Sequence, residues 1–419
     1  MKRILLTCIL NLCILLSFSQ DMSYTKKVVK DLSSRAFFGR GYVNRGDSLA
    51  ALYLKKEFKS IRLKGMSPDY YQSYVTPMST FPKDPVLVVG DKKLESASEF
   101  FVYPSSPSIK GEYPLVWLDK RVMTNGKALK SFLEKDLSSS FVVVDSAGLG
   151  NKELFSFASR LVKENVFHAK GIILRVEKLK YTARTFKSDL VKLVVKNNVL
   201  DTTMHKITVD IENRFISEYH TQNLMGYIPG KSDTCVIFSA HYDHLGMMGS
   251  KMYPGAIDNA SGVSMVLNLA RYFKKKHRKP KYTLVFMLFS GEEAGLLGSK
   301  YYVSHPLFPL ERTKILVNFD MVGTGSRGVY LFNSKTVPDM LRRFENINKK
   351  KNYVFKFHGT GEAACSDHAS FHARGVKTVS FYSDGDNEDY HETTDVSENV
   401  PYTQYEGIFK FVRDFTDQL

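Results

Sequence analysis

The chain has 419 residues, of which 43% are hydrophobic and 24% charged, and its formal net charge is +16. This length is compatible with one large domain or with two to three ordinary ones. The composition is that of a globular protein and excludes collagen-like and intrinsically disordered chains. Because the lysines are scattered along the chain, the positive charge predicts a solvated basic surface, and we expect no nucleic-acid partner.

The first nineteen residues (1–19) are expected to be a signal peptide. They begin with Lys2 and Arg3, continue with a largely apolar run at 4–16, and end with serines at the cleavage-determining positions of 17–19. The apolar run is short for a bilayer span. We therefore expect export through a Sec-type pathway to a periplasm or the extracellular medium, with no membrane anchor after the signal is removed.

Two of the four cysteines, Cys235 and Cys365, lie beyond the signal segment. A single pair does not make a disulfide framework, even in an exported protein. Cys235 falls in an apolar run, which favours a small buried side chain at this position over a disulfide.

Residues 22–81 are expected to be the N-terminal helical part of the domain that resumes at 216–419. Several apolar side chains recur there at near-helical spacing, and Gly65 predicts where the helix stops. The members of this apolar set are Leu49, Leu52, Tyr53, Phe58 and Ile61.

The segment 82–215 has a different pattern of apolar and turn residues. Short apolar runs such as "PVLVVG" and "SFVVVDS" alternate with turn residues and predict strands. Two helices are expected among them, at Lys127–Glu134 and Leu154–Lys163. Since the segment contains no constellation of acids and histidines, we interpret it as a β-rich inserted domain.

From residue 216 onward, predicted strands and helices alternate. The predicted strands are 234–241, 282–290, 314–322 and 377–383, and the predicted helices are 262–276, 292–305, 336–350 and 405–415. Alternation of this kind predicts an α/β fold, in which a mostly parallel (mixed) twisted sheet is flanked by helices on both faces.

Acids or imidazoles follow the predicted strands of this last segment. In order they are His241 and Asp243, Asp258, Glu292 and Glu293, Asp320, and His391. Ligands of open α/β sheets bind beyond the carboxyl ends of the strands. Taken singly, each group is explained as well by a polar loop or by an acid at a helix N-terminus. Taken together, they offer the imidazole and carboxylate ligands that Zn²⁺ accepts.

Two zinc ions about 3.5–4 Å apart need one bridging carboxylate and further ligands on each side. The set supplies that number with His241, Asp258, Glu293, Asp320 and His391. Glu292 is then left as a carboxylate that could take a proton from an attacking water, as hydrolysis requires. Asp243 suits a supporting role, in which it orients His241 through the other ring nitrogen.

Six motifs make residues 220–400 resemble the M28 family of zinc peptidases, the co-catalytic two-zinc aminopeptidase group. They are "AHYDHLG", "GAIDNASG", "FSGEEAGLLGS", "NFDMVG", "SDHASF" and "YHETTD". The region 82–215 is similar to a protease-associated insert. The resemblance implies that 216–419 is a zinc peptidase catalytic domain with two Zn²⁺ per chain.

The resemblance also implies a role for each site residue. His241 and Asp320 would bind one zinc, Glu293 and His391 the other, and Asp258 would bridge them. Glu292 would act as general base and then as general acid toward the leaving amine. Tyr390 would donate a hydrogen bond to the developing oxyanion, although a packing role explains it equally well. A cis peptide is expected between Asp258 and Asn259.

The function that follows is an exported aminopeptidase that hydrolyses N-terminal residues from peptides with a free N-terminus. Alternatives are a single-zinc glutaminyl cyclase of the same fold, a carboxypeptidase of the same family, and a non-catalytic binding protein on the same scaffold. The "DNASG" context and the full set of ligands favour the two-metal hydrolase. No arginine cluster near the motifs points to a carboxypeptidase pocket.

Overall fold

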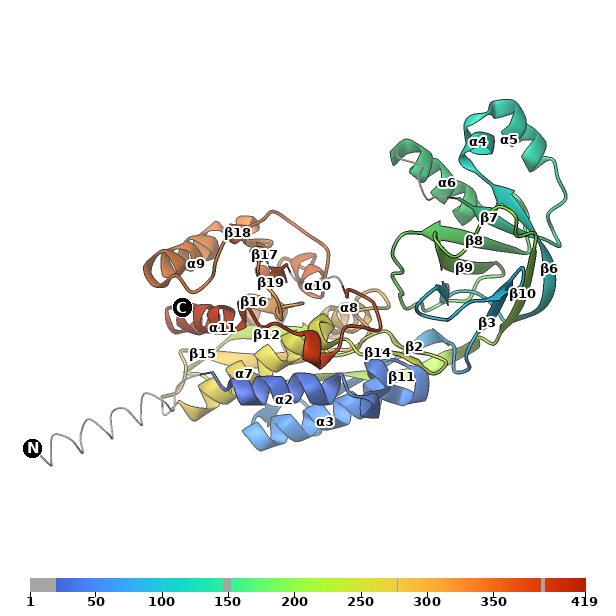
Figure 1. Cartoon of the computed structure of the whole chain (residues 1–419). Coiled ribbons are helices and arrows are strands. Elements are labelled where there is room, and N and C mark those ends of the chain that lie inside the picture. Colours follow the sequence, from blue (N-terminus) through green and yellow to red (C-terminus); the bar gives the residue numbers. More distant parts are fainter. Residues whose placement is uncertain (1–19, 146–151, 277, 386–388) are drawn as a thin grey trace, which may run out of the picture.

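The computed structural model describes residues 20–145, 152–276, 278–385 and 389–419, so the signal peptide expected at 1–19 lies outside the described residues. Two sheets organise the chain into two lobes, one broad and one standing beside it (Figure 1). Within these ranges, no helix combines the length and the apolar character needed to cross a membrane.

The larger sheet has nine strands and forms the centre of the broad lobe. Across the sheet they are β1 (Lys64–Gly65), β11 (Arg214–Ile228), β15 (Tyr282–Phe289), β12 (Ser232–His241), β16 (Thr313–Phe319), β19 (Thr378–Asp384), β17 (Gly328–Phe332) and β18 (Phe357–Gly359), with β2 (Tyr71–Thr80) paired to β11. The four central strands β15, β12, β16 and β19 run parallel to one another. Antiparallel partners, β11 and β17, flank them. The predicted mixed sheet is therefore confirmed, but parallel pairings do not outnumber antiparallel ones, since four of its eight strand pairings are of each kind.

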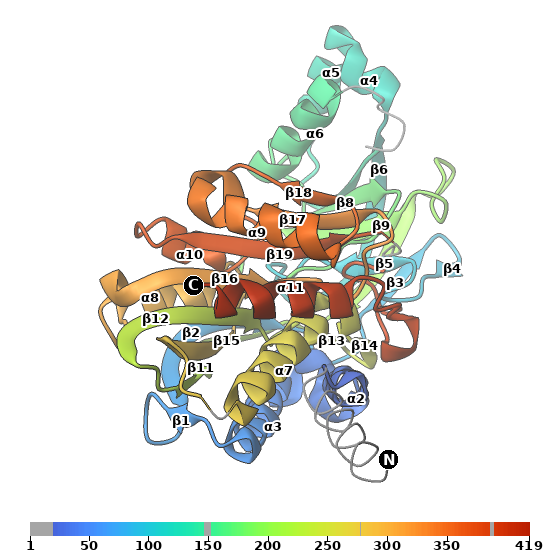
Figure 2. The same cartoon turned by 90° about the vertical axis from the view of Figure 1, so that its left-hand side faces the viewer.

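Helices cover both faces of this sheet (Figure 2). One face carries α2 (Met22–Leu32), α3 (Gly46–Ile61), α7 (Gly262–Lys275), α9 (Pro338–Lys351) and α11 (Tyr405–Asp417), and the other carries α8 (Leu297–Ser304) and α10 (His368–His372). Successive side chains of a strand point to opposite faces. Thus Val236 and Phe238 of β12 pack under the first layer, whereas Cys235 and Ile237 pack under the second. Cys235 is buried as a free thiol, as expected.

Two predicted helices differ from the structure. In α3, Leu49 and Leu52 are 38% and 48% exposed, while the fully buried side chains include Ala50, Leu54 and Phe58. The small alanine allows close packing, so the apolar face is rotated from the one expected. The helix expected at 292–305 begins only at Leu297, because the preceding residues form a turn in which the amides of Gly295 and Leu296 donate to the Glu292 carbonyl.

Short elements join these layers. They are the helical turns η1 (Arg35–Arg40), η2 (Val43–Arg45), η3 (Ala256–Ser261), η4 (Leu310–Arg312), η5 (Ser334–Thr336) and η6 (Ser397–Asn399), and the hairpin of β13 (Gly246–Met248) and β14 (Lys251–Tyr253).

The second lobe is built on an eight-stranded mixed sheet. Across it run β4 (Lys92–Lys93), β3 (Val86–Val89), β10 (Lys206–Ile211), β6 (Ile109–Leu118), β7 (Phe141–Val144), β8 (Gly171–Val176), β9 (Val191–Lys196) and β5 (Phe100–Val102). The helices α4 (Lys120–Thr124), α5 (Gly126–Leu133) and α6 (Lys152–Glu164) belong to the same lobe (Figure 1). An apolar cluster that includes Phe100, Phe141 and Ile173 fills this lobe and extends to Met248 and Tyr253 of the β13–β14 hairpin.

The chain passes from one lobe to the other through β2 and returns through β11. These two strands pair antiparallel with each other, from Tyr71 opposite Leu224 to Thr80 opposite Arg214. Both connections are therefore parts of one ribbon. The segment 22–81 is accordingly not purely helical, because it also contains the ten-residue strand β2.

Candidate metal centre

The predicted ligands come from different elements that end at one edge of the nine-stranded sheet. His241 is the last residue of β12, Asp320 directly follows β16, and Glu293 lies in the turn after β15. Asp258 lies in η3, and His391 lies in the loop between β19 and α11. All five line one pocket of about 380 Å³. The structure thus brings together every metal ligand that the sequence predicts.

Asp258 lies between two pairs of potential ligands. Its Oδ1 is 3.3 Å from His241 Nε2, and its Oδ2 is 3.3 Å from His391 Nε2. His241 Nε2 is also 3.4 Å from Asp320 Oδ1, and His391 Nε2 is 3.1 Å from Glu293 Oε2. Each carboxylate oxygen of Asp258 therefore lies beside one histidine, and each of these histidines lies beside one further acid.

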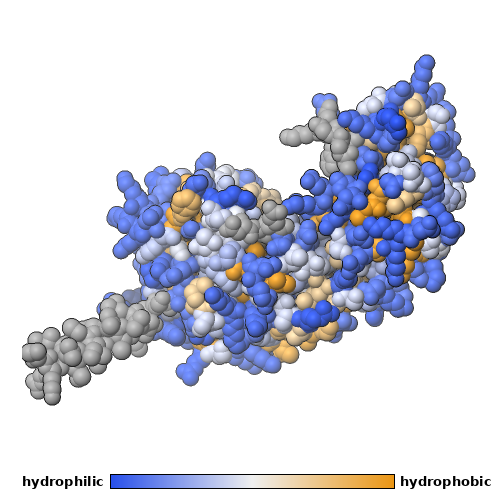
Figure 3. All heavy atoms as spheres, in the orientation of Figure 1, coloured by the Kyte–Doolittle hydropathy of each residue, from blue (hydrophilic) through white to orange (hydrophobic). Residues whose placement is uncertain are grey.

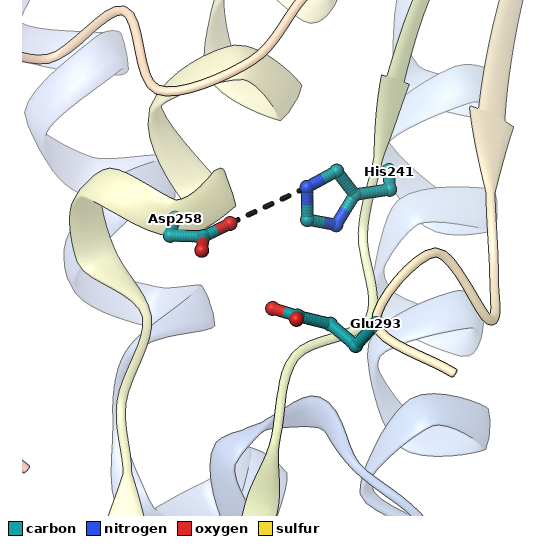
Figure 4. Close-up of side chains that lie close together, drawn as sticks. All are labelled: His241, Asp258 and Glu293. Carbon is teal, nitrogen blue, oxygen red and sulfur yellow. Dashed lines mark ion pairs between the residues drawn. The ribbon is translucent and has the colours of Figure 1, made fainter. Parts of the chain in front are cut away.

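Within this set, the ligand atoms of His241, Asp258 and Glu293 all lie within 4.8 Å of one another. Figure 4 shows the three side chains converging from different backbone segments, with the ion pair between His241 and Asp258 marked. All three are buried, at 1%, 3% and 9% exposure. Buried acids and imidazoles facing one another in this way form a donor set that suits a divalent metal such as zinc.

The loop that carries Asp258 is held from both sides. The backbone amides of Ile257 and Asp258 donate to the Asp395 carboxylate at 2.8 and 3.1 Å. On the other side, Asn259 Nδ2 donates to the Phe319 carbonyl at 2.9 Å, which ties the loop to the end of β16. The peptide between Asp258 and Asn259 is cis, as expected. These contacts fix the backbone position of the proposed bridging carboxylate.

Arg40 supports the same loop from beneath. It is fully buried, and all its recorded hydrogen bonds go to backbone carbonyls, among them Tyr242, Pro254 and Gly255 at 2.8, 2.6 and 2.8 Å. Burial lowers the pKa of Arg40 to about 10, so the side chain remains cationic near neutral pH. It thereby places a fixed positive charge behind the acidic cluster.

His244 is a part of the centre to which the sequence assigned no specific role, beyond that of a loop residue or of a residue supporting a ligand. Its Nδ1 is 2.7 Å from Glu293 Oε1. Burial raises the pKa of Glu293, but the charges of His391 and His244 outweigh it and hold that pKa at about 2. Glu293 is therefore ionised, so His244 Nδ1 must carry the proton and donate it. Its place in "AHYDHLG" is the one signal that could have suggested this role.

His391 receives support from the second lobe. Its Nδ1 lies 2.7 Å from the Tyr181 carbonyl oxygen, which belongs to the loop between β8 and β9. A ring nitrogen that donates to a carbonyl leaves the other nitrogen free to bind a metal. The ring of Tyr181 stacks on Tyr253 at 4.8 Å, which holds this loop against the broad lobe.

Asp243 acts differently from the expectation. The His241 Nδ1 partner is the backbone carbonyl of Asp243, at 3.2 Å, whereas the Asp243 carboxylate oxygen is 3.8 Å away. That carboxylate instead accepts the amides of Glu292 and Glu293 at 3.1 and 3.4 Å. Asp243 therefore fixes the turn that presents both glutamates, and it orients His241 through the main chain.

Glu292 and Tyr390 line the same pocket, next to the ligand set. Burial is the main cause that raises the pKa of Glu292 well above its ordinary value. Tyr390 is 38% exposed, and its ring stacks on His391 at 3.8 Å between centroids. Burial likewise raises the pKa of the Tyr390 phenol, so its hydroxyl keeps its proton and can donate.

The rest of the pocket was not foreseen from the sequence. An apolar side is formed by Met321, Phe332 and Tyr382 near the ends of β16, β17 and β19. Lys180 lines the pocket from the second lobe, and the exposed free thiol of Cys365 lies in it as well. Figure 3 shows the molecular surface hollowed between the two lobes.

A larger hollow of about 480 Å³ lies elsewhere, beside the amino end of β15 and the C-terminus. It is lined by cations such as Lys276, Lys279 and Lys281 and by none of the predicted site residues. Lys276 pairs there with Asp417 at 2.6 Å. Since the described residues that line it include one acid and no imidazole, we place the reactive centre in the smaller pocket.

Comparison with known proteins relates the C-terminal half of the chain to a family of peptidases. The model of Peptidase family M28 matches residues 223–416. Aminopeptidase YwaD of Bacillus subtilis (strain 168) is 29% identical over 201 residues, which are 43% of this chain and 40% of that protein. A probable leucine aminopeptidase of Arthroderma otae is 29% identical over 230 residues, or 49% and 59% of the two chains. The chain thus spans less than two thirds of these relatives' length.

Solved structures share the fold over almost the whole chain. BSAP, a zinc aminopeptidase from Bacillus subtilis, has a TM-score of 0.70 at 18% identity and is covered over 95% of both chains. An aminopeptidase from Aneurinibacillus sp. strain AM-1 has a TM-score of 0.65 at 21% identity, over 95% of this chain and 94% of that one. At these identities the likeness shows a shared architecture.

Proposed function

We propose that this chain is an exported aminopeptidase of peptidase family M28, whose model matches residues 223–416, and that it uses two zinc ions. The observation that carries the proposal is the position of Asp258, whose two carboxylate oxygens face separate pairs of potential ligands. His241 and Asp320 would hold one zinc, and Glu293 and His391 the other. The relatives with zinc and aminopeptidase in their names support the metal and the reaction class.

Bound zinc would supply Lewis acidity that polarises the scissile carbonyl. Side chains of the protein transfer the proton and stabilise the developing charge. Glu292 takes a proton from the attacking water and passes it to the leaving amine. The Tyr390 hydroxyl donates to the oxygen on which negative charge develops. Met321, Phe332 and Tyr382 surround the N-terminal side chain, so we expect apolar N-terminal residues to be preferred.

The test is to measure zinc content and turnover of an apolar aminoacyl-anilide for the wild type, Glu292→Gln and the control Glu311→Gln, which alters an exposed glutamate. We expect two zinc ions in each protein and an activity loss of about 10²–10⁴-fold in Glu292→Gln alone. One zinc with ring closure of an N-terminal Gln peptide would favour a glutaminyl cyclase. Protein without any zinc-binding capacity would overturn the proposal.

A further inference from the structure

Lys180 is the one lysine or arginine among the described residues that line the pocket. Its neighbours Leu179 and Tyr181 are 3% and 5% exposed, while Lys180 itself is exposed. The backbone is therefore anchored on both sides of a side chain that projects outward. The Tyr181 carbonyl binds His391 Nδ1 at 2.7 Å, so the anchor is part of the metal centre itself.

The ammonium group of Lys180 has no ion pair or hydrogen bond with another described residue. Its recorded contact is the ring of Tyr390, whose centroid lies 5.8 Å from Nζ. Tyr390 in turn stacks on His391. A cation that is held near the reaction centre, and that has no acidic partner among the residues the structure describes, is available to a ligand.

The two sides of the pocket differ in chemistry and in origin. Met321, Phe332 and Tyr382 belong to the broad lobe, and Lys180 belongs to the second lobe. A peptide whose N-terminal side chain lay against the apolar residues would pass its remaining residues through the pocket that Lys180 also lines. An extended residue spans about 3.3–3.6 Å, so a carboxylate one or two residues beyond the scissile bond would lie only a short way along this pocket, where a flexible lysine side chain could meet it.

We propose that Lys180 is a specificity residue that binds a carboxylate on the leaving part of the substrate, in particular the C-terminal carboxylate of di- and tripeptides. This inference rests on the proposed aminopeptidase function and gives it a substrate class, namely short peptides with a free C-terminus. The second lobe thereby contributes a substrate contact as well as the support for His391.

The experiment compares Leu-Gly with Leu-Gly amide, which differ only in the charge at the C-terminus. Binding is measured by calorimetry in a zinc-loaded Glu292→Gln background, and kcat/KM is measured in the otherwise native enzyme. We expect the free acid to be favoured by about three- to tenfold, the range of a charge-assisted contact that is partly exposed. Lys180→Ala should bring this ratio close to 1, Lys180→Arg should keep it, and Lys180→Glu should invert it.

Lys187→Ala is the matched control, because Lys187 is exposed on the same loop but does not line the pocket. It should keep the wild-type ratio. A second pair, Leu-Asp amide and Leu-Asn amide, separates a side-chain carboxylate from the terminal one, and we expect the smaller effect there. A wild-type ratio of 1 for the first pair, or a ratio that Lys180→Ala does not change, would overturn the inference.

Failure of the proposed function gives a different result. In that case neither peptide would be cleaved by the zinc-loaded enzyme, while the binding titrations would still report whether Lys180 distinguishes acid from amide.

Discussion

The Tyr181 carbonyl oxygen and His391 Nδ1, 210 residues apart in the chain, lie 2.7 Å from each other. One belongs to the lobe of the eight-stranded sheet and the other to the proposed metal centre. The hydrogen bond sets which nitrogen of His391 is free to bind a metal, so the second lobe takes part in the geometry of the site.

Replacing Tyr181 with alanine should weaken zinc binding. The substitution removes the stacking on Tyr253 that holds the carbonyl in place. Loss of such outer support typically costs about 10–100-fold in metal affinity. Competition with a chromophoric chelator measures the effect. Tyr181→Phe keeps the ring and should match the wild type, whereas equal affinity in Tyr181→Ala would show that the carbonyl is held by other contacts.

His244 offers a test of the contact with Glu293. We expect His244→Leu to lower zinc affinity by about 10–100-fold, since Glu293 loses the donor that keeps it oriented. His244→Asn should recover much of the affinity, because the asparagine amide nitrogen can occupy the place of Nδ1. The same chelator competition reads out both variants. If His244→Leu and His244→Asn lower the zinc affinity equally, His244 supports Glu293 by packing rather than by a hydrogen bond.

Arg40→Met should lower the free energy of unfolding by about 3–5 kcal/mol, which is the usual cost of breaking a buried charged network. The substitution leaves several buried carbonyls without donors, among them those of Tyr242 and Gly255. Arg40→Lys keeps the charge with fewer donors and should fall in between. Denaturant unfolding measures the difference. Arg342→Met, an exposed change on α9, is the control and should stay within about 0.5 kcal/mol.

Removing zinc should lower the melting temperature without changing the fold. Without zinc, Asp258, Glu293 and Asp320 lie close together, and their ion-pair partners among the described residues are histidines. A metal at 100 times its dissociation constant stabilises the folded state by about 2.7 kcal/mol. Calorimetry at several free zinc concentrations checks this, and Asp258→Asn should respond much less. A melting temperature that is independent of zinc in the wild type would contradict the site.

Much of the fold could be predicted because buried parallel strands are continuous apolar runs. The runs before His241 and Asp320 marked both the strands and the edge where their polar residues meet. The apolar face of α3 was harder, because Leu49 fits the helical period as well as Ala50 does, and only tertiary packing decides which is buried.

The five proposed ligands were predictable because each follows its own strand or loop motif. The supporting residues were not, since their roles depend on distant contacts. His244 meets an acid 49 residues away, and Arg40 meets carbonyls more than 200 residues away. Lys180 reaches the pocket only because the second lobe lies beside the broad one, an arrangement that no local pattern encodes.

The ribbon of β2 and β11 has a mechanical consequence. Both crossings between the lobes belong to this one ribbon, and its register shifts between Ile216 and Tyr219, where a bulge bends a strand. A rotation of the second lobe about that point would carry Lys180 and Tyr181 away together. The same movement would widen the entrance of the pocket and lengthen the hydrogen bond that His391 Nδ1 makes with Tyr181. The proposed affinity for zinc and the length of peptide that the pocket accepts would therefore change together.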